Sequence, residues 1–77
     1  MIDHLKHMAV FAWVVDKGSF RAAAQDIGVA PSRVSQTITD LENHLGTTLL
    51  YRTTRKLALT GEGRALYTRV TEMLRSA

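Results

Sequence analysis

Apolar residues in the first part of the chain recur at intervals of three and four, which is the spacing of a helix with one buried face. On this basis we predict three helices, over residues 2–17, 20–27 and 31–45. Each is followed directly by a glycine, which readily takes the left-handed backbone conformation that ends a helix. Pro31 fits the first turn of the third helix, because the backbone nitrogen there has no partner within the helix.

The second part of the chain changes its pattern. Two short apolar runs, residues 49–51 and 57–59, flank the basic stretch 52–56, which predicts a β-hairpin with a basic tip. Thr60 can cap a fourth helix that continues to the end of the sequence. A short helix is marginal in water, so its apolar stripe must pack on something, and a second copy of the chain is the simplest partner. The stripe consists of Leu66, Val70, Met73 and Leu74.

Only three residues separate the second and third predicted helices, a spacing typical of a helix-turn-helix, in which the first helix braces the second against DNA. The third helix carries an apolar stripe on one face and small or polar residues on the other, which suits a major groove about 12 Å wide. Arg33 has the chemistry to pair with guanine and Gln36 with adenine. The alternative is an ordinary amphipathic surface helix.

The distribution of charge adds to this picture. The 77 residues carry a net charge of +3, and the excess lies in the second part of the chain. Residues 1–46 have four Lys and Arg against five Asp and Glu, whereas residues 47–77 have six against two. This asymmetry indicates a surface for a polyanion, with a solvated charged face as the alternative.

Composition and motifs make other function classes improbable. The chain has no cysteine and no long apolar run, so we expect no disulfide, thiolate zinc site, signal peptide or membrane span, and a cytoplasmic location. His4 and His7 are three residues apart but lack a third metal ligand. Residues 61–63 have only a fragment of a phosphate loop. No serine has the partners of a catalytic triad. We therefore expect no metal, cofactor or enzymatic activity.

An ordered set of motifs resembles the LysR-type transcriptional regulators over essentially the whole chain. The motifs are Gly18-Ser19-Phe20 with Ala23-Ala24, Pro31-Ser32 with Val34-Ser35, Ile38 with Leu41-Glu42, Leu45-Gly46 with Leu49, Arg52, and Leu59-Thr60 with Gly63. The resemblance implies a mainly α fold with a winged helix-turn-helix in residues 1–60, followed by a linker and dimerisation helix in residues 61–77. The helix-turn-helix itself would span about 20–39 and the wing about 49–60.

The resemblance also implies roles for individual residues. The chain would bind an interrupted palindrome in double-stranded DNA as a homodimer. The base-reading residues would be Pro31, Ser32, Arg33, Ser35 and Gln36. The residues on the phosphate backbone or in the minor groove would be Ser19, Arg21, Arg52, Thr53, Thr54, Arg55 and Lys56. The dimer interface would contain Leu66, Val70, Met73 and Leu74.

The sequence departs from the family pattern in three ways. Leu50 stands where a phenylalanine is usual, and Ala30 where a capping serine is common. Third, we expect the chain to be an isolated DNA-binding part, without the C-terminal domain that binds a small-molecule effector in the family. A winged helix of another regulator family, such as the MarR type, is an alternative. A protein-docking winged helix is a second one, although a basic hairpin tip suits it poorly.

Overall fold

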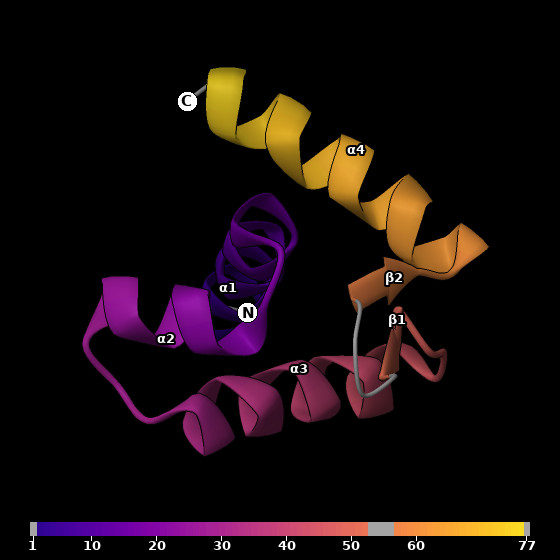
Figure 1. Ribbon diagram of the computed structural model, residues 1–77. Coiled ribbons are helices and arrows are strands. Elements are labelled where there is room, and N and C mark those ends of the chain that lie inside the picture. Colours follow the sequence, from indigo (N-terminus) through magenta and orange to yellow (C-terminus); the bar gives the residue numbers. More distant parts are fainter. Residues whose placement is uncertain (1, 53–56, 77) are drawn as a thin grey trace.

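The structure is a computed structural model that describes the backbone of residues 2–52 and 57–76 and the side chains of residues 5–51 and 57–75. Its elements are α1 (Ile2–Lys17), α2 (Phe20–Ile27), α3 (Pro31–Leu45), β1 (Leu50–Arg52), β2 (Leu57–Leu59) and α4 (Gly61–Ser76) (Figure 1). The helices have the predicted bounds, which confirms the mainly α architecture. The predicted segment 53–56 lies outside the described residues.

The first three helices enclose one apolar core. Phe11 and Val14 of α1 contribute fully buried side chains, and Ala23 and Ala24 let α2 approach closely. The core also contains Val34, Ile38 and Leu41 from α3 and Leu49 and Leu50 at the wing. The apolar stripe of α3 is therefore directed inward, and its polar face is left to solvent.

The turns between these helices are built as their sequences predict. The Ser19 hydroxyl oxygen accepts a hydrogen bond from the backbone nitrogen of Ala22, which caps α2. Gly28 ends α2 with φ of 89°, a conformation that favours glycine. Ala30 precedes α3 without a side-chain cap, so the departure from the usual serine is visible in the structure.

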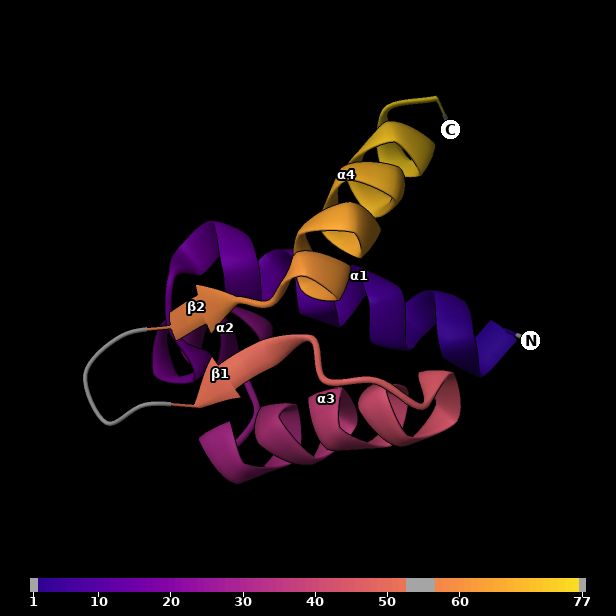
Figure 2. The same ribbon diagram turned by 90° about the vertical axis from the view of Figure 1, so that its right-hand side faces the viewer.

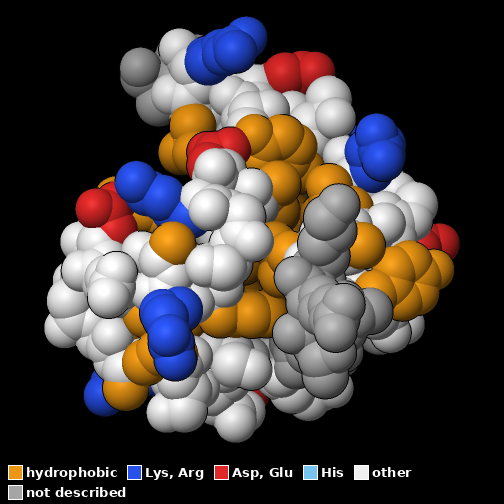
Figure 3. Space-filling model, viewed as in Figure 1, with side chains coloured by type: hydrophobic (Ala, Val, Ile, Leu, Met, Phe, Trp, Pro, Cys, Tyr) orange, Lys and Arg blue, Asp and Glu red, His pale blue; other side chains and the backbone are white. Residues whose placement is uncertain are grey.

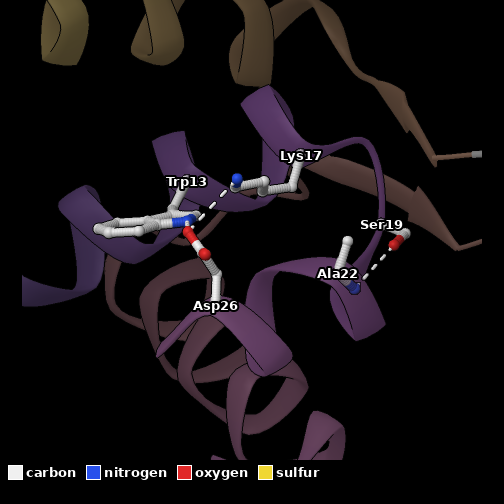
Figure 4. A network of polar contacts seen from close by, with 5 residues as sticks. All are labelled: Trp13, Lys17, Ser19, Ala22 and Asp26. Atoms are coloured by element: carbon white, nitrogen blue, oxygen red, sulfur yellow. Dashed lines mark hydrogen bonds and ion pairs between the residues drawn. The ribbon is translucent and has the colours of Figure 1, made fainter. Parts of the chain in front are cut away.

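Helices α1 and α2 are joined at the surface by a small polar network (Figure 4). The indole nitrogen of Trp13 donates to a carboxylate oxygen of Asp26 at 3.0 Å, and the Lys17 ammonium lies 3.3 Å from the same oxygen. Trp13 is 42% exposed. It therefore lies outside the core, and its hydrogen bond links α1 to α2 at the surface.

The hairpin is antiparallel, with Tyr51 opposite Ala58 and Arg52 opposite Leu57. Strand β1 begins at residue 50, one residue later than the predicted run. The Leu49 oxygen still accepts a hydrogen bond across the hairpin from the backbone nitrogen of Thr60, but the Leu49 nitrogen donates to the side chain of Glu42 and not to the opposite strand.

Helix α4 lies across α1, on the opposite side of the molecule from α3 in both views (Figures 1 and 2). Val70 is buried, and the Tyr67 hydroxyl donates a hydrogen bond to the Asp16 carboxylate. Within the described part of the chain, no helix combines the length and the hydropathy needed to cross a membrane.

Candidate DNA-binding surface

The first two turns of α3 present a polar surface without an acidic residue. Pro31, Ser32, Arg33 and Gln36 are exposed, and Ser35 is half-buried. These are the five residues that the sequence predicts to read bases. The opposite face of the same turns is fixed in the core by Val34 and Ile38. The buried face fixes the helix, and the helix presents these residues to solvent.

Arg33 lies in the first turn of α3 and is exposed. Among the described residues, no carboxylate forms an ion pair with its guanidinium. Its planar donor groups are thus available for a ligand. Such a fork of N–H groups matches the two acceptors on the major-groove edge of guanine.

Gln36 is oriented by a residue one turn further along the helix. Its side-chain nitrogen donates to the Asp40 carboxylate at 2.9 Å. The second N–H of the amide and its carbonyl oxygen remain available, which is the donor and acceptor pair that adenine requires. This role of Asp40 was not predicted, although a glutamine and an aspartate four residues apart are neighbours on a helix.

The N-terminus of α2 provides a second polar surface. The hydroxyl oxygen of Ser19 accepts the bond that caps the helix. The hydroxyl hydrogen can therefore still donate to an anion. Arg21 is exposed in the first turn. A helix N-terminus carries partial positive charge from unpaired N–H groups, so this end of α2 is suited to a phosphate.

The hairpin lies beside α3 and is tied to it by Glu42. One carboxylate oxygen of Glu42 accepts hydrogen bonds from the backbone nitrogens of Leu49 at 2.7 Å and Leu50 at 3.2 Å. Tyr51 on β1 is exposed. The predicted wing residues Thr53, Thr54, Arg55 and Lys56 lie outside the described residues, as does the side chain of Arg52.

The strands lead toward the same side of the molecule as the N-terminal end of α3 (left in Figure 2). Figure 3 looks onto this side, and in its lower half basic side chains are visible while acidic ones are almost absent. The first turns of α2 and α3 also contain no acidic residue. This side therefore combines the predicted base-reading and backbone-contacting elements.

The predicted dimer residues on α4 divide into two groups. Met73 and Leu74 are exposed, with 46% and 55% of their surfaces accessible. Leu66 is half-buried against the core, and Val70 is only 1% exposed. Val70 therefore packs within its own chain and is not on the exposed surface of α4, where we predicted it. On α1, Leu5 is also exposed.

The described residues contain no group of three or more potential metal ligands. The side chain of His4 is not among them, so the histidine pair singled out in the sequence is not placed. Gly63, part of the phosphate-loop fragment, lies against the backbone of Leu49 rather than in an open loop.

Comparison with known proteins identifies the family. The family described as "Bacterial regulatory helix-turn-helix protein, lysR family" matches residues 5–64. The chain belongs to this family. The winged helix-turn-helix and the LysR-type resemblance inferred from the motifs are thereby confirmed.

Two relatives and one solved structure illustrate the similarity. This LysR-family chain is 53% identical over 66 residues to the HTH-type transcriptional repressor PA14_22550 of Pseudomonas aeruginosa (strain UCBPP-PA14). The matched stretch covers 86% of this chain and 21% of that protein. It is 45% identical over 73 residues to the HTH-type transcriptional activator AaeR of Escherichia coli (strain K12), covering 95% of the chain and 24% of that protein. The chain thus spans under a quarter of the length of these curated relatives.

Among solved structures, the LysR-family chain resembles the BenM DBD in its complex with catB site 1 DNA. The TM-score is 0.88 and the sequence identity 35%, covering 94% of this chain and 77% of that one. The arrangement of four helices and one hairpin is therefore that of a protein solved together with DNA.

Proposed function

We propose that this chain is the DNA-binding part of a LysR-type transcriptional regulator and that it binds duplex DNA sequence-specifically. Helix α3 lies in the major groove, and the hairpin contacts the phosphate backbone or the minor groove. The observation that carries the proposal is the acid-free, exposed polar face in the first two turns of α3, above a face fixed in the core. The likeness to the BenM DBD in its DNA complex supports it.

In this proposal, the side chains have separate tasks. Arg33 and Gln36 contact base edges. Pro31, Ser32 and Ser35 also face the bases, and their small side chains let the helix approach the floor of the groove. Ser19 and Arg21 contact phosphate from α2, and the basic hairpin residues contact it from the other side. Phosphate contacts fix the position of the protein on DNA, and base contacts provide the sequence preference.

The proposal includes a homodimer formed through α4. Helix α4 lies on the opposite side of the molecule from α3 (Figures 1 and 2). Met73 and Leu74 are exposed on α4 and supply an apolar contact. A two-fold axis near these residues leaves both recognition helices free to enter successive major grooves, about 34 Å apart or a multiple of it. Residues 1–60 then serve DNA binding and residues 61–77 serve dimerisation.

Binding rather than catalysis follows from the same assignment. The functional side chains are spread over an exposed helix face and a hairpin, which suits a duplex and not a small substrate. A small-molecule effector would act through a separate domain of the longer regulator. The DNA target places the regulator in the bacterial cytoplasm.

The salt dependence of binding tests this function. We expect the affinity for DNA to fall steeply with ionic strength, because contacts to phosphate release counterions. Replacing Arg55 and Lys56 with alanine should reduce the slope of log K against log salt by about 0.9 for each lost contact in each chain. Fluorescence anisotropy with labelled duplexes measures both slopes.

The competing function, docking of a protein partner, gives another result. Binding through a mainly apolar interface would respond weakly to salt, and an unchanged slope in the double variant would place the hairpin away from phosphate. Loss restricted to A·T-rich duplexes would locate the hairpin in the minor groove.

A further inference from the structure

The backbone of Leu49 is the point at which α3, the hairpin and α4 meet. Its nitrogen donates to Glu42 of α3 at 2.7 Å. Its oxygen accepts from the backbone nitrogen of Thr60 at 3.0 Å and from the Thr60 hydroxyl at 3.2 Å. The same hydroxyl donates to the Thr48 oxygen at 2.6 Å and accepts from the Gly63 nitrogen at 2.9 Å. Thr60 is 5% exposed, so these contacts are shielded from water.

Gly63 lies so close to this junction that no side chain fits. A β-carbon at residue 63 would lie 2.0 Å from the Leu49 oxygen, where real contacts are essentially never below 3.0 Å. The conflict would be with backbone, which cannot rotate aside as a side chain can. Gly61, in the same helical turn, has no neighbour within 4 Å of the equivalent position. The requirement for glycine is therefore specific to residue 63.

Helix α4 has a second attachment further along. Tyr67 bonds to Asp16 of α1, and Val70 is buried one turn later. Two attachments separated along a rigid helix fix its direction. The first is the contact between Gly63 and Leu49, and the second is the contact with α1.

We propose that Gly63, held by Thr60 against Leu49, is a positioning residue that sets the angle between α4 and α3 and thereby the spacing of the DNA half-sites. The proposal rests on the proposed function, in which α4 joins two chains and α3 reads each half-site. This angle requires residue 63 to pack against the Leu49 backbone more closely than any residue with a side chain could.

The size of the effect follows from helix geometry. A side chain at residue 63 must displace that end of α4 by about 1 Å, and Tyr67 lies about 6 Å along the axis while the C-terminal end lies about 13 Å beyond it. Rotation about Tyr67 then moves the C-terminal end by about 2 Å, and the two chains of a dimer together contribute about 4 Å. This is close to one base-pair step of about 3.4 Å.

A distance measurement within one chain tests the angle without DNA. The sequence has no cysteine, so spin labels can be attached only at introduced ones. Asn43→Cys on α3 and Arg75→Cys on α4 are exposed positions for the labels. The labelled chain is diluted with unlabelled chain, and the distance is measured by double electron–electron resonance. Gly63→Ala should shift the distance by about 2 Å or broaden its distribution, whereas Gly61→Ala should leave it unchanged.

The two glycine variants form a matched pair, because both replace glycine with alanine in the first turn of one helix. Any general gain in helix propensity is common to both. A folded Gly63→Ala chain with the distance of the unmodified chain would overturn the proposal. If Gly63→Ala does not fold, Thr60→Val decides, since it removes the hydroxyl contacts and keeps the shape. A broadened distance supports the proposal, and an unchanged one refutes it.

Selection from a random duplex pool then reads the consequence for DNA. The unmodified chain and Gly61→Ala should enrich palindromes with one spacer length, and Gly63→Ala should change the preferred spacer by one base pair or accept several. An identical spacer preference in all three chains would refute the link to half-site spacing. If the unmodified chain enriches no sequence, the proposed function fails, and the distance measurement still decides whether Gly63 fixes the angle.

Discussion

At the scale of single side chains, we expect the sequence preference to depend most on Arg33. It is exposed in the first turn of α3, on a helix whose other face is buried. Arg33→Ala should weaken binding to the preferred site by about 1–3 kcal/mol and relax the preference at one position of each half-site. Quantitative binding to a set of single-base variants of that site measures both effects.

Arg21→Ala is the control, because this residue is expected to contact only phosphate. It should weaken binding to all sequences by a similar factor. If Arg33→Ala behaved in the same uniform way, Arg33 would be a phosphate contact and not a reader of bases.

Tyr67 is a second residue with a measurable signature. Its hydrogen bond to the Asp16 carboxylate, with smaller contributions from burial and from the charge of Asp16, raises the pKa of Tyr67 above the ordinary value of 10.0. The folded state therefore favours the protonated phenol. Its contribution to the free energy of unfolding is complete below pH 10 and is lost as the pH rises through the raised pKa.

We expect Tyr67→Phe to lower stability at neutral pH and to abolish this part of the alkaline loss. Urea unfolding of both chains at several pH values measures the difference. Because the chain has two tyrosines, the Tyr51→Phe variant leaves Tyr67 as the only phenol for titration by near-ultraviolet absorbance. A Tyr67 titration at or below its ordinary pKa would contradict the observed contact.

Glu42 joins two elements, the recognition helix and the first strand of the hairpin. One carboxylate oxygen of Glu42 accepts hydrogen bonds from the backbone N–H groups of Leu49 and Leu50. Glu42→Ala leaves two partly buried donors without this partner and should lower the free energy of unfolding by about 1–3 kcal/mol. Glu42→Gln retains an oxygen at this position and should preserve most of the stability. Urea unfolding followed by circular dichroism makes the comparison, and equal losses in both variants would show that charge rather than the hydrogen bonds matters.

At the scale of the elements, the bounds of the helices could be predicted from the sequence, but the contacts where the elements meet could not. Helix ends could be predicted because glycine follows each of the first three helices and takes positive φ there. The start of β1 could not, since the backbone nitrogen of Leu49 donates to the side chain of Glu42, which belongs to the preceding helix. Gly63 is part of the motifs that resemble the family, but the reason for the glycine could not be predicted, because the Leu49 oxygen that excludes a side chain comes from another element.

The candidate DNA-binding surface was predictable to a similar degree. The polar face of α3 could be predicted because a polar face opposite an apolar stripe is a local property of one helix, and its role in reading bases stays a prediction. The hydrogen bond between Gln36 and Asp40 was not predicted, although the two residues are four positions apart on the same helix. The division of the α4 stripe was beyond the sequence, because apolar spacing does not distinguish a face that packs on its own chain, as at Val70, from one left exposed, as at Leu74.

At the scale of the molecule, the candidate DNA-binding helix α3 and the proposed dimerisation helix α4 lie on opposite sides (Figures 1 and 2). Dimerisation can then proceed without covering the recognition helix. Leu74→Asp places a charge in the exposed apolar patch on α4, where burying it is costly. We expect monomers that keep the fold and bind half-sites weakly. Sedimentation at tens of micromolar, with circular dichroism, measures association and folding.

Ala65→Asp is the matched control for this variant. It introduces the same charge at an exposed position nine residues away, which at 100° per residue is the opposite side of α4. It should leave the dimer intact. An unmodified chain that is monomeric both free and on DNA would remove the dimer from the account.

We propose above that the outward face of α3 reads the sequence of duplex DNA. Selection of bound sequences from a random duplex pool by the unmodified chain tests it most directly. We expect an interrupted palindrome whose half-sites are centred about one helical turn of DNA apart, or a multiple of it, with two chains on each site. Tight binding with no enriched sequence would contradict the claim, because it would mean that the chain holds the phosphate backbone without reading bases.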